Sequence, residues 1–150
     1  YASGAPYEQI ATIVQANLAD IGIDVTLEPM ETATLKSTCV DGKQELFLWR
    51  WNEDSKVDFV YRDLFYTGSG SNYHHYSDSK ADEMIDIVAT EKDQDKRLET
   101  AKELQTYLVD ACPQVPLYIA NLVVAYNKNL QGQYFYGGGN HDWRHAYIAE

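Results

Sequence analysis

The apolar residues of this chain repeat with two different periods. Spacings of three and four residues place side chains on one face of a helix. They predict helices over residues 7–20, 32–39, 57–66, 79–89 and 94–111. Alternation of apolar and polar residues, or a short apolar run, predicts strands instead. These strands are expected over 23–28, 45–51, 115–119, 122–126 and 143–148.

Residues that interrupt regular structure lie between these segments. Gly22 stands where the first helix should end, Ser79 can cap the helix that begins there, and Pro113 ends the last long helix. The apolar run of 45–51 predicts a central strand that is buried on both faces. Helices that alternate with strands predict an α/β fold, with a mixed sheet flanked by helices.

The bulk properties narrow the class of protein. A length of 150 residues fits one domain, and the net charge of −11 argues against a nucleic-acid partner, whose phosphates attract lysine and arginine. No apolar run approaches the roughly 20 residues that a membrane span needs. The chain opens on Tyr1 without an initiator methionine, so we expect a fragment of a longer protein.

The stretch from Gln44 to Tyr76 has the residue types of a ligand site. An apolar segment ends in Trp49, Arg50 and Trp51, and Asp54 follows. A helix-like segment and a loop rich in glycine and serine come next. Ligands of open α/β sheets lie beyond the carboxyl ends of the strands, so this strand end is a candidate for the grip on a polar organic ligand.

An ordered series of short motifs runs along the chain. The series is Ser3–Pro6, Leu18–Val25, Leu27–Glu31, Trp51 with Asp54, Tyr76–Asp78, Ala81–Met84, Asp95–Arg97, Pro113–Tyr118 and Tyr126–Gly132. In this order and spacing the chain resembles the C-terminal lobe of the family 5 extracellular solute-binding proteins. These are the peptide, dipeptide and nickel receptors of ABC importers. The resemblance covers nearly the whole chain, and its specificity lies in the ordered set.

The resemblance implies a fold, a location and partners. The fold is one lobe of a two-lobed periplasmic-binding protein (type II), with residues 1–139 as the C-terminal lobe and 140–150 as a tail that returns to the first lobe. The location is extracytoplasmic, either periplasmic or as a cell-surface lipoprotein. The partners are a small solute, most often a peptide, the first lobe of the parent chain and an ABC permease. The family consists of receptors and not enzymes, and no cofactor is expected.

The resemblance also implies ligand-binding residues. Asp54 would pair with the α-amino group of a peptide, and Trp51 would pack on its backbone. Asn72 and Tyr73 occupy the position of the family's cleft loop, and Arg50 could hold a carboxylate or form an ion pair within the protein. The structural alternatives are a core position for Trp51, a helix cap for Asp54 and a turn role for Asn72. The chain departs from the family after Asp54, where no Asp-Pro pair follows.

Other functions stay open on the sequence alone. The solute could be a sugar, nickel or haem, or the domain could serve as a sensor or scaffold of the same fold. The adjacent His74 and His75 should point to different sides of the chain, and no cysteine and histidine spacing suggests zinc. His141 and His145 have the i,i+4 spacing of a helix, which the preceding glycines disfavour, and a metal-binding module would need these two side chains to converge. Cys39 and Cys112 could form a disulfide, worth on the order of 4 kcal/mol, or remain two separate thiols.

Overall fold

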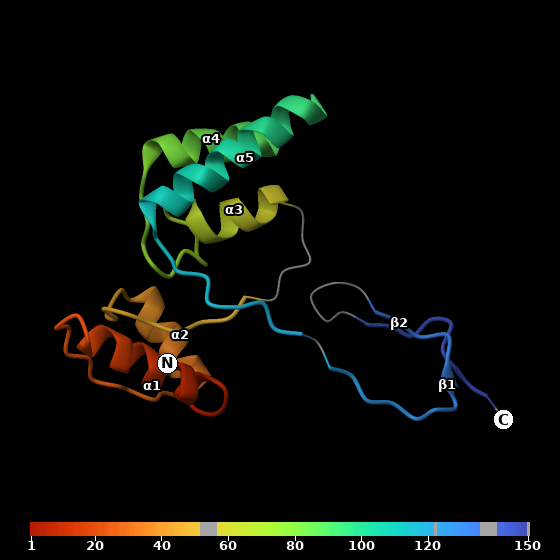
Figure 1. The fold of residues 1–150 in the computed structure, drawn as a ribbon. Coiled ribbons are helices and arrows are strands. Elements are labelled where there is room, and N and C mark those ends of the chain that lie inside the picture. The colour runs from red at the N-terminus through yellow and green to blue at the C-terminus, as the bar shows by residue number, and fades with distance from the viewer. Residues whose placement is uncertain (52–56, 122, 136–140, 150) are drawn as a thin grey trace.

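The structure is a computed structural model, which describes residues 1–51, 57–121, 123–135 and 141–149. Its helices are α1 (Tyr7–Ala19), α2 (Thr32–Val40), α3 (Val57–Phe65), α4 (Ser79–Thr90) and α5 (Gln94–Ala111). Each predicted helix is therefore confirmed to within a single residue at either end. Figure 1 shows α3, α4 and α5 together in one group, and α1 and α2 in a second group beside it.

Aspartate side chains cap the N-termini of α4 and α5. Oδ1 of Asp78 accepts hydrogen bonds of 2.9 Å from the backbone N–H groups of Lys80 and Ala81, so it satisfies donors that have no partner within α4. The prediction that Ser79 caps this helix is wrong by one residue, because the carboxylate of Asp78 takes that place. Asp93 caps α5 in the same way.

The first hydrophobic core lies among α3, α4 and α5, and we call it the helical core. Its buried residues are Leu64, Phe65, Ala81, Ile85, Val88, Ala101, Leu104 and Leu108. The hydroxyl of Tyr107 on α5 donates a 2.9 Å hydrogen bond to Oδ2 of Asp78, which ties α5 to the start of α4. These backbone and tyrosine hydrogen bonds, that of Ala81 foremost, hold the pKa of Asp78 below its ordinary value.

A second core, the aromatic core, lies beside α2. Its buried residues are Ala2, Leu35, Cys39 and Tyr73, and Tyr7, Met30, Phe47, Trp49 and Trp51 pack against it. A parallel bridge between Ala2 and Met30 holds the N-terminal segment in place. The N–H of Ser3 donates to the carbonyl of Met30 at 2.7 Å within that bridge. Trp51 also packs against the helical core, so it contacts both cores.

The strands are shorter than the sequence predicts. They are β1 (Leu130–Gln131), β2 (Tyr134–Phe135), β3 (His141–Asp142) and β4 (Tyr147–Ile148). Strand β1 pairs antiparallel with β4, and β2 pairs antiparallel with β3. Helices with small sheets make an α/β fold, as predicted, and the end of the predicted 143–148 strand is β4.

The larger mixed sheet is the part of the prediction that the structure corrects. Among the described residues, segments 23–28, 45–51, 115–119 and 123–126 form no strand ladder. An alternating sequence becomes a strand only where a second segment supplies hydrogen bonds along its length. The apolar side chains of 115–119 and of Val123 consequently lie in solvent, with Ile119 at 96% and Val123 at 88% exposure.

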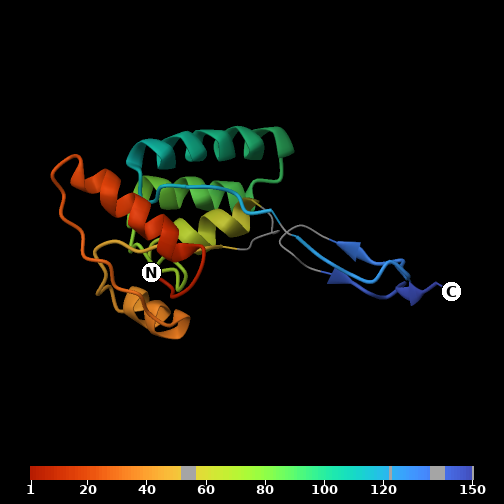
Figure 2. The same ribbon diagram turned by 60° about the horizontal axis from the view of Figure 1, so that its bottom comes forward.

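Residues 123–135 and 141–149 form an arm that extends away from the helices in both views (Figures 1 and 2). The ring of Phe135 lies at its centre, in contact with the rings of Tyr126, His141 and Trp143. The described part of the predicted tail pairs with residues 130–135 of the same chain. The division into a lobe of 1–139 and a returning tail stays a prediction. Across the described residues, each helix falls short of the length and apolarity that a bilayer crossing needs.

Two isoleucines of α4 test the helical core. Ile85 is fully buried, whereas Ile87 is 40% exposed on the same helix. We expect Ile85→Ala to lower the free energy of unfolding by about 2–5 kcal/mol, because it leaves a cavity among α3, α4 and α5. Ile87→Ala, the matched control, should cost less than about 1 kcal/mol in a urea titration. Equal losses for the two variants would contradict this assignment of the core.

Candidate functional site

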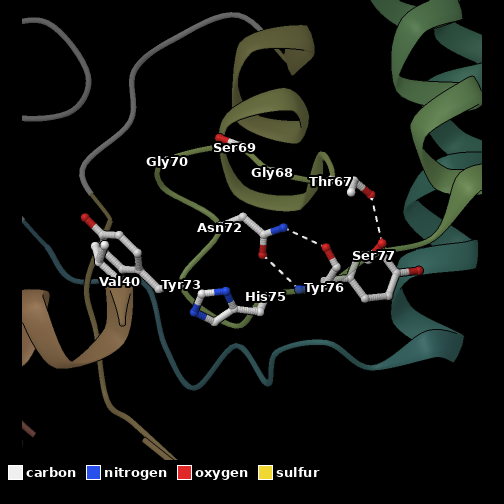
Figure 3. Close-up of a pocket in the computed structure, with 10 residues that line it drawn as sticks. All are labelled: Val40, Thr67, Gly68, Ser69, Gly70, Asn72, Tyr73, His75, Tyr76 and Ser77. Atoms are coloured by element: carbon white, nitrogen blue, oxygen red, sulfur yellow. Dashed lines mark hydrogen bonds between the residues drawn. The ribbon is translucent and has the colours of Figure 1, made fainter. Parts of the chain in front are cut away.

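The loop between α3 and α4, residues 67–77, borders a half-open cavity of about 330 Å³ against α2. Val40 of α2 lines it together with Thr67, Gly68, Ser69, Gly70, Asn72, Tyr73, His75, Tyr76 and Ser77. Figure 3 shows Val40 and the ring of Tyr73 at one end, and the hydroxyl groups of Thr67 and Ser77 at the other. A volume of this size suits a small ligand or one part of a larger ligand.

Asn72 holds this loop in shape from within. Its side-chain N–H groups donate to the carbonyls of Tyr66 at 3.1 Å and Tyr76 at 2.7 Å, and its Oδ1 accepts from the N–H of Tyr76 at 3.1 Å. The residue is only 5% exposed. Because both amide hydrogens are engaged by backbone carbonyls, that of Tyr76 in the view of Figure 3, the turn role is the one that the structure displays. Contact of Asn72 with a ligand stays a prediction.

Tyr73 and the two tryptophans make an aromatic surface next to the cavity. Tyr73 is 4% exposed, and its ring centroid lies 5.4 Å from Trp49, edge to face, and 5.3 Å from Trp51. The Trp49 and Trp51 rings are 6.3 Å apart. Trp51 is half-buried. The structure thus joins two of the predicted site residues, with Tyr73 as the buried support of Trp51.

Arg50 and Asp54 are the remaining predicted site residues. Arg50 is exposed, on the segment that carries Trp49 and Trp51. Asp54 lies outside the described residues, so its pairing with a ligand amine and its alternative role as a helix cap both stay predictions. The binding roles of Trp51, Tyr73 and Arg50 also stay predictions.

Sequence reasoning missed two residues that hold the loop against the aromatic core. Nε2 of Gln44 donates a 2.6 Å hydrogen bond to the carbonyl of Tyr73. Nε2 of His75 lies 2.8 Å from the carbonyl oxygen of Cys39 on α2. No motif distinguishes such residues, because each contact joins the loop to a segment about 30 positions away in the sequence.

His74 points the other way, toward α3, as expected for the neighbour of His75. Its ring meets that of Phe65 edge to face at 5.4 Å. Its Nε2 is buried and has no hydrogen-bond partner among the described residues. Burial first, and the nearby His75 second, lower the pKa of His74. The site therefore contains an imidazole that favours its neutral form.

The two cysteines are free thiols, which is one of the two alternatives left open by the sequence. Cys39 is buried in the aromatic core, and burial raises the pKa of its thiol. Cys112 is exposed at the end of α5, where it takes the left-handed conformation that ends the helix. The two residues belong to separate parts of the fold. Within the described ranges, no three or more histidine, cysteine, aspartate or glutamate side chains gather where they could hold a metal ion.

Replacement of Asn72 should destabilise the protein, because Asn72 holds loop 67–77 in shape. Asn72→Ala removes the Asn72 donor from the carbonyls of Tyr66 and Tyr76 and the acceptor of the Tyr76 N–H, whereas the Tyr66 carbonyl keeps its bond from the N–H of Ser69. We expect a loss of about 2–4 kcal/mol in the free energy of unfolding. Asn127 supplies the control, because among the described residues its side chain accepts one hydrogen bond, from the backbone N–H of Asn129 in an exposed turn. Asn127→Ala should cost less than about 1 kcal/mol. Thermal and urea unfolding measure both, and a mild effect of Asn72→Ala would show that the loop does not depend on this amide.

The buried His74 predicts a pH dependence of stability. Because its pKa is lowered in the folded state, the unfolded chain binds a proton more readily, and stability is lost as the pH falls below the ordinary value of 6.5. His74→Leu keeps an apolar contact with Phe65 but cannot titrate. Urea titrations from about pH 7.5 to about pH 5 should therefore show a smaller loss for His74→Leu than for the unmodified chain. Parallel curves for the two proteins would contradict this assignment, and His141→Gln, in the arm, should leave the curve unchanged.

Comparison with known proteins gives this geometry its context. Residues 1–73 match the family of bacterial extracellular solute-binding proteins, family 5 Middle. This stretch contains Trp51, Asn72 and Tyr73. The chain is also similar in fold to the PBP/SBP MoaA from A. tumefaciens R10, solved in complex with mannopinic acid. The TM-score is 0.63 at 24% identity, over 71% of this chain and 22% of that one.

Curated relatives match most of the chain. It is 25% identical, over 86% of its length, to the probable D,D-dipeptide-binding periplasmic protein DdpA of Escherichia coli. It is 26% identical, over 91%, to the probable ABC transporter periplasmic-binding protein SapA of the same species. It is 27% identical, over 83%, to the di/tripeptide-binding protein 2 of Pseudomonas aeruginosa. The chain spans about a quarter of the length of these relatives, 26%, 26% and 24% respectively.

The family match, the relatives and the fold agree with one another. They confirm the predicted α/β fold of a periplasmic-binding protein, and the periplasmic relatives confirm an extracytoplasmic location. The family consists of solute receptors and not of enzymes. Residues 1–73 of this chain match the family 5 bacterial extracellular solute-binding proteins, and the relatives and the fold agree with that match.

Proposed function

We propose that this chain supplies one side of the binding site of a peptide receptor that serves an ABC importer. The observation that carries the proposal is the family match over residues 1–73, which includes the aromatic surface of Trp51 and Tyr73. The printed names of three relatives, which refer to dipeptides or to di- and tripeptides, support a peptide as the solute.

The aromatic surface suits the backbone of a short peptide. The half-buried ring of Trp51 offers a flat apolar face, and the buried Tyr73 fixes its orientation from behind. A rigid aromatic side chain loses little conformational entropy when it packs on a ligand. The peptide would lie across Trp51, at the edge of the cavity that loop 67–77 forms.

A charged anchor completes the proposed site. The free α-amino group of a peptide is a cation, and Asp54, three residues beyond Trp51, is the carboxylate that we assign to it. A charge-assisted hydrogen bond of this kind is about twice as strong as a neutral one. It would select a free amino terminus, whereas the aromatic surface would accept various side chains.

Capture would proceed by closure of two lobes around the solute, after which the closed receptor docks on the permease. No bond is made or broken in this mechanism. Good sites enclose roughly 70–90% of their ligand, and one side of a cleft cannot do so. This chain by itself should therefore bind peptides weakly, and sub-micromolar affinity of the 150-residue chain would contradict the one-sided assignment.

A thermal-shift screen tests the proposal on the full-length protein that carries this sequence. Pools of dipeptides and tripeptides are compared with pools of sugars, with nickel and with haem. A peptide at about 100 times its dissociation constant adds about 2.7 kcal/mol of stability, so the peptide pools should raise the melting temperature. Asp54→Asn and Trp51→Ala should abolish the shift.

The control variant is Trp143→Ala, which removes a tryptophan from the arm, away from the proposed site. It should retain the peptide shift. A shift with another pool and none with peptides would overturn the peptide assignment and keep the receptor. A full peptide shift in Asp54→Asn would show that this carboxylate is not the anchor.

A further inference from the structure

Loop 67–77 connects two helices of the helical core, but one of its residues packs in the aromatic core. It leaves α3 and enters α4, which both contribute to the helical core. Its residue Tyr73, however, is buried in the aromatic core beside α2. The position of Tyr73 relative to the tryptophans therefore depends on whatever holds the loop against α2.

The bond from His75 to α2 holds the loop against that helix. Nε2 of His75 lies 2.8 Å from the carbonyl oxygen of Cys39, and Cys39 is in the last turn of α2. The Cys39 carbonyl also accepts a 3.1 Å hydrogen bond from the backbone N–H of Gly42, and its second lone pair is available to the imidazole. The bond fixes the tautomer in which Nε2 carries the hydrogen, because a carbonyl can only accept.

The backbone of His75 adds a second, independent indication. Its φ of +52° lies in the left-handed region, which is uncommon for residues other than glycine, although asparagine, aspartate and histidine adopt it more often than the rest. Such a conformation at a histidine persists where the surroundings hold it. Gly42, in the turn after α2, leaves room for the imidazole, since a Cβ there would lie 3.3 Å from Nε2 of His75.

We propose that His75 is a positioning residue, a latch that fixes loop 67–77 on the end of α2 and so holds Tyr73 against Trp49 and Trp51. Gln44 assists by its bond to the carbonyl of Tyr73, but that bond orients the backbone at one point. His75 joins the loop to a helix. Its importance for ligand affinity rests on the proposed function, whereas the latch itself does not.

Two substitutions separate the hydrogen bond from the backbone conformation. In His75→Gln the side-chain amide nitrogen reaches about as far as Nε2, so the bond to Cys39 can form again. In His75→Asn the side chain is one methylene shorter and cannot reach, although asparagine tolerates the left-handed region better than glutamine does. If backbone strain mattered most, asparagine would be the better replacement. If the bond matters most, glutamine will be.

Amide hydrogen exchange of this chain measures the latch directly. We expect the backbone amides of Tyr73, His75 and Tyr76 to exchange between about twofold and tenfold faster in His75→Asn, as loss of one hydrogen bond predicts. His75→Gln should restore the slow exchange. The amides of α4 and α5 should be unchanged in both variants, which also confirms that the chain is folded.

Three results would overturn the latch. The first is exchange of His75→Asn at the rate of the unmodified chain. The second is equal loosening in His75→Gln and His75→Asn, which would assign the effect to the imidazole ring or the backbone. The third is loss of protection throughout α4 and α5, which would make His75 a contributor to global stability alone.

Binding of the peptide pool by the full-length protein then tests the link to the site. His75→Asn should weaken the thermal shift, and His75→Gln should preserve it. Equal shifts for His75→Asn and the unmodified protein would show that the latch does not serve ligand binding. If the unmodified protein gives no peptide shift, the proposed function fails, and the exchange pattern still decides whether the latch exists.

Discussion

The contact between Trp51 and Tyr73 is the constraint on which the rest of this structure depends. The helical core and the aromatic core bury separate sets of residues, and Trp51 packs against both. Tyr73 reaches it from the loop between α3 and α4, with ring centroids 5.3 Å apart. Large aromatic side chains bury about 150–250 Å² each, so this pair can join two small cores into one unit. The same pair forms the surface that we propose for the ligand, and stability and binding therefore share residues.

The excess of acidic residues has a structural use as well. Asp78 and Asp93 cap α4 and α5, and Asp82 accepts a hydrogen bond from the backbone N–H of Thr67 at the start of the loop. Negative charge at the N-terminus of a helix is stabilised by the helix dipole. Part of the net charge of −11 thus organises the helices that frame loop 67–77. A cationic ligand is not needed to explain this part of the negative charge.

The exposed apolar residues after α5 fit a chain that supplies one side of a larger site. Ile119 and Val123 lie almost wholly in solvent, and the arm beyond them is held by short strands and by the aromatic contacts of Phe135. Apolar surface of this kind gains stability when another surface covers it. This agrees with the proposal that the chain works together with further parts of a receptor. The chain spans about a quarter of the length of its relatives.

The sequence by itself determined the helices and indicated a resemblance to a family. Helical periodicity is local, since residues three and four apart must share a face, and it located all five described helices, including the buried face of α4 with Ile85. It also identified Trp51, Asn72 and Tyr73 as a group worth attention. Only the tertiary structure decided what these residues do to one another. Strand pairing joins residues 130–135 to residues 141–148, and the bonds of Gln44 and His75 join segments 29 and 36 positions apart. Neither these bonds nor the burial of Tyr73 leaves a periodic trace in the chain.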